Sequence, residues 1–204
     1  MGCAVRLGVY AFSIGFFICA QGAATKVFGK DGKDGGTVRP VNTSKIKQVS
    51  ISPTEFQWRE HPKLSWEDFK GPVNAENDES AAATHCGIGF RMNKPDHAGN
   101  PEVVVYNTFY VNKSWVRSDA KISSILDHEQ GHFDLCEIFT RKLSARLRNF
   151  DFSVPDMKKS LLQAFNEVNV EYEKSQQAYE SETTHGTNLG EQRKWEDRIS
   201  HQLN

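Results

Sequence analysis

The motif HEQGH, residues 128–132, combines side chains that can bind a divalent metal ion with one that can move a proton. Residues four positions apart on a helix share one face and lie about 6 Å apart along the axis, so two imidazoles can converge on one ion. Imidazole is a common zinc ligand, and a neighbouring carboxylate can take a proton from a zinc-activated water. The motif therefore predicts a Zn²⁺ site with His128 and His132 as ligands and Glu129 as general base.

The helix that carries the motif does not supply a third ligand. Glu137 lies five residues beyond His132, which places it roughly 140° away around the helix. Cys136 is on the correct face but about 12 Å along the axis from His128, whereas zinc–ligand bonds are only about 2 Å long. The third ligand must come from another part of the chain.

Two sources of this ligand remain open. One is His185, in the break TTHG after a second predicted helix. The other is a glutamate on that helix: Glu173, Glu180 or Glu182. A tight helical hairpin would place residues near 174–176 opposite residue 130, which favours a glutamate. A bend after Tyr179 would instead bring His185 to the metal.

The elements that must position these side chains are helical in the second half of the chain. Apolar spacing predicts a long, largely buried helix from Ser118 as cap to about Asn149. A second helix from near Pro155 to the break at Gly186 is expected to pack antiparallel on the first. A third helix follows, with Asn188 as its cap and a glutamate in the capping-box position.

The region before the long helix shows strand and turn signals. Residues 82–92 and 102–111 predict a β-hairpin with a long loop, residues 45–51 a further strand, and residues 65–71 a short helical turn. The predicted fold is α+β: a small N-terminal sheet or hairpin packed on the long metal-binding helix, followed by an antiparallel helix and a C-terminal helix. Residues 46–204 would form this domain.

Residues 1–24 have the features of a secretory signal peptide. Arg6 precedes an apolar run of 14 residues, and small residues follow with cleavage expected after Ala23 or Ala24. The run is shorter than the roughly 20 residues that span a bilayer, so no stable membrane insertion is expected after cleavage. Residues 25–45 contain GKDGKDGG and predict a flexible linker. The mature protein would be secreted or periplasmic.

The net charge and the cysteine content limit the classes of binding partner and the possible states of the thiols. The formal net charge is −1, with 25 basic and 26 acidic residues, which argues against nucleic acid as a partner. Removing residues 1–24 leaves two cysteines, Cys86 and Cys136. They could form a disulfide in an oxidising compartment or remain buried free thiols.

A set of short motifs in this order and spacing resembles a known family. The segments LSWEDFKG, AAATHCGI, KSWV, HEQGHFDLCE, YESETTHG and EQRKW are similar to the secreted bacterial family known as domain of unknown function 922 (DUF922). Members are regarded as zinc-dependent peptidases with a zincin-like fold. The family usually has aspartate after the tyrosine, where this chain has Glu180. The resemblance therefore favours His185 as the third ligand.

The function expected from these observations is that of a secreted zinc metallopeptidase acting on a peptide or protein. Glu129 would take a proton from the attacking water and pass it to the leaving amine. Tyr179 is a candidate donor to a developing oxyanion, with core packing as its alternative. Two other functions stay open: a metal-stabilised binding or scaffold module without turnover, and a zinc amidase acting on cell-wall material.

Overall fold

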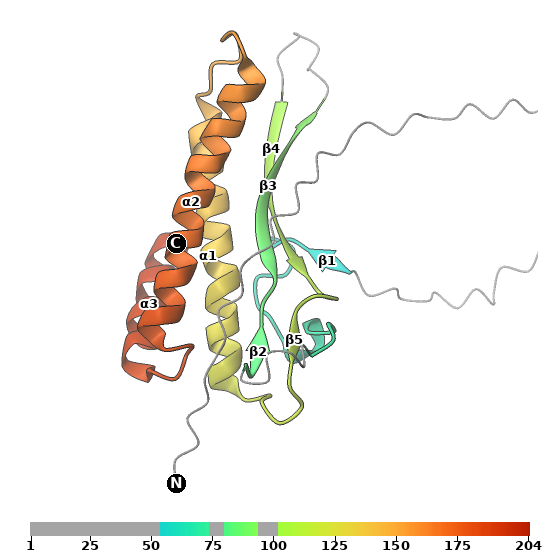
Figure 1. Ribbon diagram of the computed structural model, residues 1–204, viewed down its shortest axis with the longest axis vertical. Coiled ribbons are helices and arrows are strands. Elements are labelled where there is room, and N and C mark those ends of the chain that lie inside the picture. Colours follow the sequence, from blue (N-terminus) through green and yellow to red (C-terminus); the bar gives the residue numbers. More distant parts are fainter. Residues whose placement is uncertain (1–53, 74–79, 94–101) are drawn as a thin grey trace, which may run out of the picture. The chain divides into compact units, whose positions relative to one another are not determined.

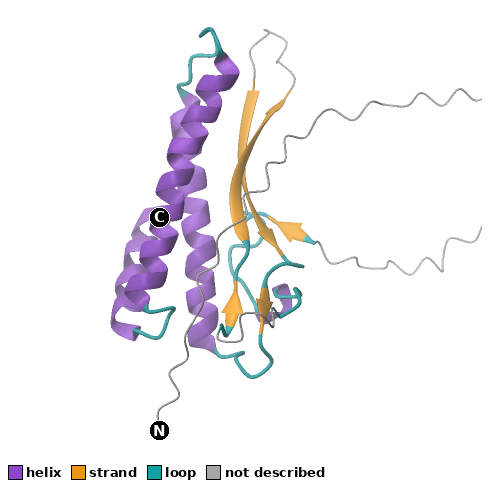
Figure 2. Cartoon of the chain, viewed as in Figure 1, coloured by secondary structure: helices purple, strands orange, loops and turns teal. Residues whose placement is uncertain are grey.

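The computed structural model describes residues 54–73, 80–93 and 102–204. The predicted signal peptide, the linker and the strand at 45–51 lie outside the described residues, as does the loop of the predicted hairpin. Within the described ranges, strands come first and three helices follow, as Figures 1 and 2 show. The predicted α+β organisation is confirmed.

The strands form two small antiparallel sheets. In the first, the order is β1 (Glu55–Phe56), β4 (Glu102–Tyr110), β3 (Cys86–Asn93). The register of β3 and β4 pairs residue 86 with 109 and residue 93 with 102, which confirms the predicted hairpin. The second sheet pairs β2 (Ala82–Ala83) with β5 (Trp115–Val116). The first predicted strand is thus divided between two sheets, with residues 84 and 85 between them.

The predicted short helical turn is also present. It is a 3₁₀ helix, η1 (Trp66–Asp68), whose N-cap is Ser65. The Asp68 carboxylate accepts hydrogen bonds from the Ser65 backbone N–H at 2.8 Å and from its hydroxyl at 2.9 Å. Both hydrogen bonds run from Ser65 to Asp68, and they hold the first turn of this short helix closed.

The three helices are α1 (Ser123–Arg148), α2 (Met157–Thr183) and α3 (Leu189–Leu203). Asn188 caps α3 as predicted, because its side chain accepts a hydrogen bond from the Glu191 N–H. The prediction that Ser118 caps α1 was wrong. The Arg117 N–H still bonds to the Ala81 carbonyl, and a turn from 117 to 120 follows, so the chain is free to become helical only from Ser123.

Helix α1 lies at the centre of the domain and is buried on several sides. It contacts β3 and β4 on one side and α2 and α3 on another, with α2 running antiparallel to it (Figure 1). This arrangement explains why its apolar residues surround much of its circumference. None of the helices in the described part of the chain has the length and apolar character needed to cross a bilayer.

An aromatic cluster joins the three-stranded sheet to α1. Phe109 of β4 stacks on Phe56 with ring centroids 4.9 Å apart and meets Phe133 of α1 edge-on at 5.3 Å. Phe109 and Phe133 are fully buried, and burying one such side chain contributes roughly 1.5–3 kcal/mol. Phe133 directly follows His132, so this packing holds the HEQGH motif in place against the sheet.

Candidate metal centre

Helix α1 places the two histidines of the motif side by side and away from water. His128 and His132 are 5% and 6% exposed, and their Nε2 atoms lie 3.2 Å apart. Two tetrahedral zinc ligands bonded at about 2.0–2.1 Å lie about 3.3–3.4 Å apart. The predicted convergence of both imidazoles is therefore present.

The other ring nitrogen of each histidine is held by a glutamine. The Gln192 Oε1 atom lies 3.2 Å from Nδ1 of His128, and the Gln176 Oε1 atom lies 2.5 Å from Nδ1 of His132. An amide oxygen only accepts, so each Nδ1 carries the proton and donates it. Nε2 of each imidazole is therefore the nitrogen that can bind a metal, once any proton on it has left.

Glu180 of α2 supplies a carboxylate beside these two nitrogens. Its Oε2 lies 3.4 Å from Nε2 of His128 and its Oε1 lies 3.3 Å from Nε2 of His132. Each imidazole thus faces a different oxygen of the carboxylate, and one ligand atom from each of the three side chains lies within 4.8 Å of the other two. Among the described residues, His128, His132 and Glu180 are the one group of three His, Cys, Asp or Glu side chains that could hold a metal ion.

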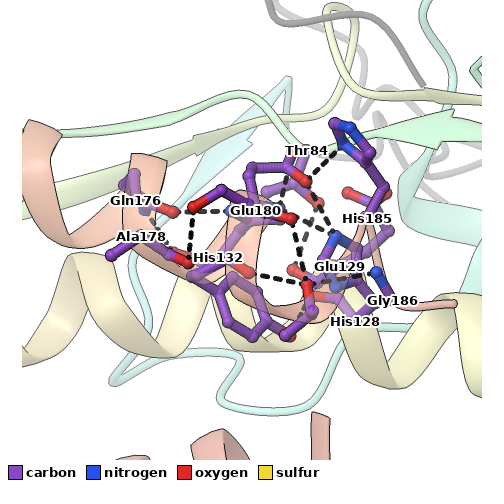
Figure 3. A network of polar contacts seen from close by, with 12 residues as sticks. Thr84, His128, Glu129, His132, Gln176, Ala178, Glu180, His185 and Gly186 are labelled. Atoms are coloured by element: carbon purple, nitrogen blue, oxygen red, sulfur yellow. Dashed lines mark hydrogen bonds and ion pairs between the residues drawn. The ribbon is translucent and has the colours of Figure 1, made fainter. Parts of the chain in front are cut away.

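His185, which the family resemblance favoured as the third ligand, lies outside this group. Its Nδ1 is 2.8 Å from Oε2 of Glu180, so it contacts the carboxylate and not the point between the two imidazoles. Figure 3 shows Glu180 linked to His128, His132 and His185. Helix α2 continues to Thr183 without the bend that would bring His185 to the ion.

The remaining candidate ligands have other partners. Glu173 accepts a hydrogen bond from Asn169, and Glu182 accepts one from the Trp195 indole. Glu137 is bonded to Asn107 and Arg141. Cys86 and Cys136 are buried free thiols, Cys86 lying against the Tyr172 hydroxyl and the His132 carbonyl. None of these side chains belongs to the group described above.

The charges of the group attract one another strongly. Burial lowers the pKa of His132, but the Glu180 carboxylate outweighs burial and raises that pKa to about 9. Burial raises the pKa of Glu180, but the two imidazoles outweigh it and hold that pKa well below its usual range. The site thus stabilises positive charge between the imidazoles and the carboxylate, as a cation site requires.

Glu129 lies next to the first histidine and is 4% exposed. Its Oε2 atom is the one buried side-chain oxygen or nitrogen without a hydrogen-bond partner among the residues that the structure describes. Leaving a buried carboxylate oxygen unpaired costs free energy, and such groups are rare outside functional sites. An oxygen in this condition is suited to accept a proton from a bound water.

Tyr179, the other predicted catalytic residue, is fully buried and engaged within the core. Its hydroxyl donates to the His128 carbonyl at 3.0 Å and receives a hydrogen bond from the Gln192 amide at 2.9 Å. Burial raises its pKa well above the usual range, so the phenol stays neutral. These contacts match the core-packing alternative for Tyr179.

Two glycines leave room for this arrangement. A Cβ on Gly131 would overlap the Tyr179 hydroxyl and lie 2.6 Å from its Cζ. Gly186 has φ of +76°, and a Cβ there would lie 2.8 Å from Cγ of His128. Glycine is favoured at both positions, because each backbone approaches a side chain of the site too closely for any other residue.

Sequence reasoning missed the two glutamines, although a signal was present. Gln176 interrupts the apolar stripe of α2 between Tyr172 and Tyr179, and it is 2% exposed. Gln192 lies three residues before Trp195 on the buried face of α3 and is 4% exposed. A polar side chain on an apolar stripe must find a partner, and here the partners are the histidines.

Comparisons with known proteins bear on the region that carries the site. The profile of one family, described as a bacterial protein of unknown function (DUF922), matches residues 68–186, which is more than half of the chain. No curated protein and no solved structure gives a significant match. The matched region contains His128, Glu129, His132 and Glu180 and ends before α3. The chain belongs to the DUF922 family.

Proposed function

We propose that this protein is a secreted zinc-dependent peptidase of the zincin type. His128, His132 and Glu180 would hold Zn²⁺, and Glu129 would act as general base. Two imidazoles and one carboxylate form a donor set used by catalytic zinc sites, where three protein ligands leave a fourth position open. The side chain of Glu180 is 33% exposed, so solvent reaches one side of the group.

The unpartnered Glu129 carboxylate is the observation that carries this proposal. A closed structural site needs no such group, and an internal partner would normally satisfy a buried glutamate. A bound divalent ion supplies Lewis acidity, which polarises a carbonyl and lowers the pKa of water. Glu129 then accepts the proton of the attacking water and delivers it to the leaving amine nitrogen.

The strand beside the motif supports a peptide as the substrate. The Thr84 hydroxyl donates to the Glu129 carbonyl at 3.2 Å, so the chain directly after β2 lies against the motif. β2 pairs with β5 alone among the described strands, which leaves its other side free of strand partners there. An extended peptide could add to this edge through backbone hydrogen bonds. This position supports a peptide substrate over a small molecule.

Metal analysis tests the ligand set. Purified mature protein is expected to contain one zinc ion per chain. Glu180→Ala should lose it, whereas Glu182→Ala, a matched change two residues further along α2, should retain it. His185→Ala is also expected to retain zinc, because His185 contacts the Glu180 carboxylate and not the point where the ligands converge. Wild-type protein without zinc affinity would refute the proposal.

Hydrolysis is tested with two probes that separate the candidate substrates. Labelled casein reports peptidase activity, and purified peptidoglycan reports cleavage of cell-wall amides. We expect casein cleavage that a chelator abolishes and added zinc restores. Cleavage of peptidoglycan alone would instead identify an amidase. Stoichiometric zinc with neither activity would identify a metal-stabilised module and overturn the peptidase proposal.

A further inference from the structure

Helix α3 reaches the metal centre although it lies beyond the part of the chain that the family profile matches. Its Gln192 side chain is buried and makes two contacts at the site. The amide oxygen accepts from Nδ1 of His128 at 3.2 Å, and the amide nitrogen donates to the Tyr179 hydroxyl at 2.9 Å. The same amide nitrogen also donates to Glu196, one turn further along α3, at 2.9 Å.

These contacts close a ring of hydrogen bonds around His128. The Tyr179 hydroxyl, which receives the Gln192 N–H, donates its own proton to the backbone carbonyl of His128 at 3.0 Å. The histidine is thus held at its ring nitrogen and at its backbone. Its imidazole also stacks on the Tyr179 ring, with centroids 4.7 Å apart. Ring rotation and tautomer are both restricted.

His132 is held in the same way by a single residue. Gln176 accepts from Nδ1 of His132 at 2.5 Å and donates to the His132 backbone carbonyl at 2.9 Å. Figure 3 shows this glutamine beside His132. Each histidine of the motif therefore has a buried amide that contacts both its ring and, directly or through Tyr179, its own carbonyl.

We propose that Gln192 is a positioning residue of the metal centre, and that α3 is required for tight metal binding because it supplies this side chain. The inference rests on the proposed zinc site. Partners that orient a metal-binding histidine usually contribute 10–100-fold to metal affinity. An amide performs this role without adding charge, so Glu180 and Glu129 remain the carboxylates beside the ion.

Zinc affinity measured by competition with a chromophoric chelator tests the proposal. Gln192→Leu removes the acceptor and is expected to weaken zinc binding 10–100-fold. The control is Gln202→Leu, which changes an exposed glutamine on the same helix and should leave affinity unchanged.

Unfolding of the metal-free variants separates positioning from folding. If Gln192→Leu folds and binds zinc as tightly as wild type, the proposal is overturned. Should this variant fail to fold, Gln192→Asn decides, because its amide is one methylene too short to reach Nδ1. Undiminished affinity in a folded Gln192→Asn protein would also overturn it. Absence of zinc binding in wild type would instead refute the proposed function itself.

Discussion

Helix α1 contains two buried glutamates that the fold treats in opposite ways. Glu129 and Glu137 are eight residues apart and are 4% and 0% exposed. Glu137 accepts hydrogen bonds from Asn107 at 2.5 Å and from Arg141 at 2.8 Å. The Oε2 atom of Glu129 has no such partner among the described residues. The same residue type on one helix is hydrogen-bonded at one position and has an oxygen without a partner at the other.

This difference agrees with a structural role for Glu137 and with the general-base role proposed for Glu129. Asn107 of β4 and Arg141 of α1 compensate the cost of burying the Glu137 charge, so this residue ties the sheet to the helix. No described residue hydrogen-bonds to the Oε2 atom of Glu129, and this carboxylate is close enough to His132 to raise the pKa of its imidazole. Burial alone does not distinguish the two glutamates, whereas their hydrogen bonds do.

Replacing each glutamate with glutamine is the most direct test of the difference between Glu129 and Glu137. Glu129→Gln should lower casein hydrolysis about 10²–10⁴-fold, the usual contribution of a general base, while zinc content and urea stability are retained. Full hydrolytic activity in this variant would remove Glu129 from the mechanism.

The matched change at the second glutamate should have the opposite effect. Glu137→Gln removes the charge from two charge-assisted hydrogen bonds and should lower the free energy of unfolding by about 1.5–3 kcal/mol, with zinc affinity unchanged. Urea unfolding and chelator competition measure the two quantities. If this variant lost zinc at unaltered stability, the assignment of Glu137 to structure would fail.

The close packing between Gly131 of α1 and Tyr179 of α2 can be tested by substituting the glycine. Gly131→Ala would drive a methyl group into the Tyr179 ring and should cost about 1–3 kcal/mol of stability. Gly87→Ala, where a Cβ would meet nothing within 4 Å, is the matched control and should be close to neutral. Equal thermal midpoints for both variants would show that α1 and α2 do not approach this closely.

The affinity of the group formed by His128, His132 and Glu180 for zinc should depend on pH. In the metal-free protein the pKa of His132 is about 9, so a proton must leave before zinc binds at neutral pH. Apparent zinc affinity should rise about tenfold per pH unit and level off above pH 9. The proton on His132 stabilises the metal-free fold fully below its ordinary pKa of 6.5, and this stability is lost as pH rises through 9.

Calorimetry in two buffers of different ionisation enthalpy counts the released proton. Glu137→Gln is the control for this measurement, since it leaves both histidines and Glu180 in place and should show the same pH dependence. An affinity that does not change between pH 6.5 and 9 would contradict the strong pairing of His132 with Glu180.

The smallest expected effect concerns α3, which lies beyond the residues that the family profile matches. Asn188→Ala removes the N-cap of α3 and should cost about 1 kcal/mol of stability. Because α3 carries Gln192, a small loss of zinc affinity should accompany it. Asn166→Ala, an exposed change on α2, serves as the control in both thermal melts and chelator competition.

Local patterns in the sequence were sufficient to predict much of the fold and half of the site. The hairpin of β3 and β4, the three helices and the Asn188 cap are confirmed. Convergence of His128 and His132 follows from helix geometry alone, because residues four apart share a face wherever the helix is placed. The start of α1 was predicted too early in the chain, because the Arg117 N–H is hydrogen-bonded to the Ala81 carbonyl and the helix begins only after it. The pattern of neighbouring residues does not indicate a hydrogen bond between such distant positions.

The third ligand depended on how α2 lies against α1. The expected register placed residues 174–176 opposite residue 130, whereas Gln176 actually lies against His132 and Tyr179 against Gly131. A shift of about one turn therefore decides which carboxylate reaches the imidazoles. The periodic pattern of apolar residues does not determine this register. It depends on side-chain packing and on the connection between the two helices.

The sequence by itself determined the chemistry that the motif can perform: two imidazoles and a carboxylate on one face of a helix. Tertiary structure alone decided that Glu180 joins His128 and His132 in one group that could hold a metal, that His185 contacts this carboxylate, and that Oε2 of Glu129 has no hydrogen-bond partner among the described residues. The physical reason is the distance along the chain between the residues that interact. Helix geometry relates neighbours in the chain, whereas ligand completion and hydrogen-bond satisfaction depend on residues some fifty positions away.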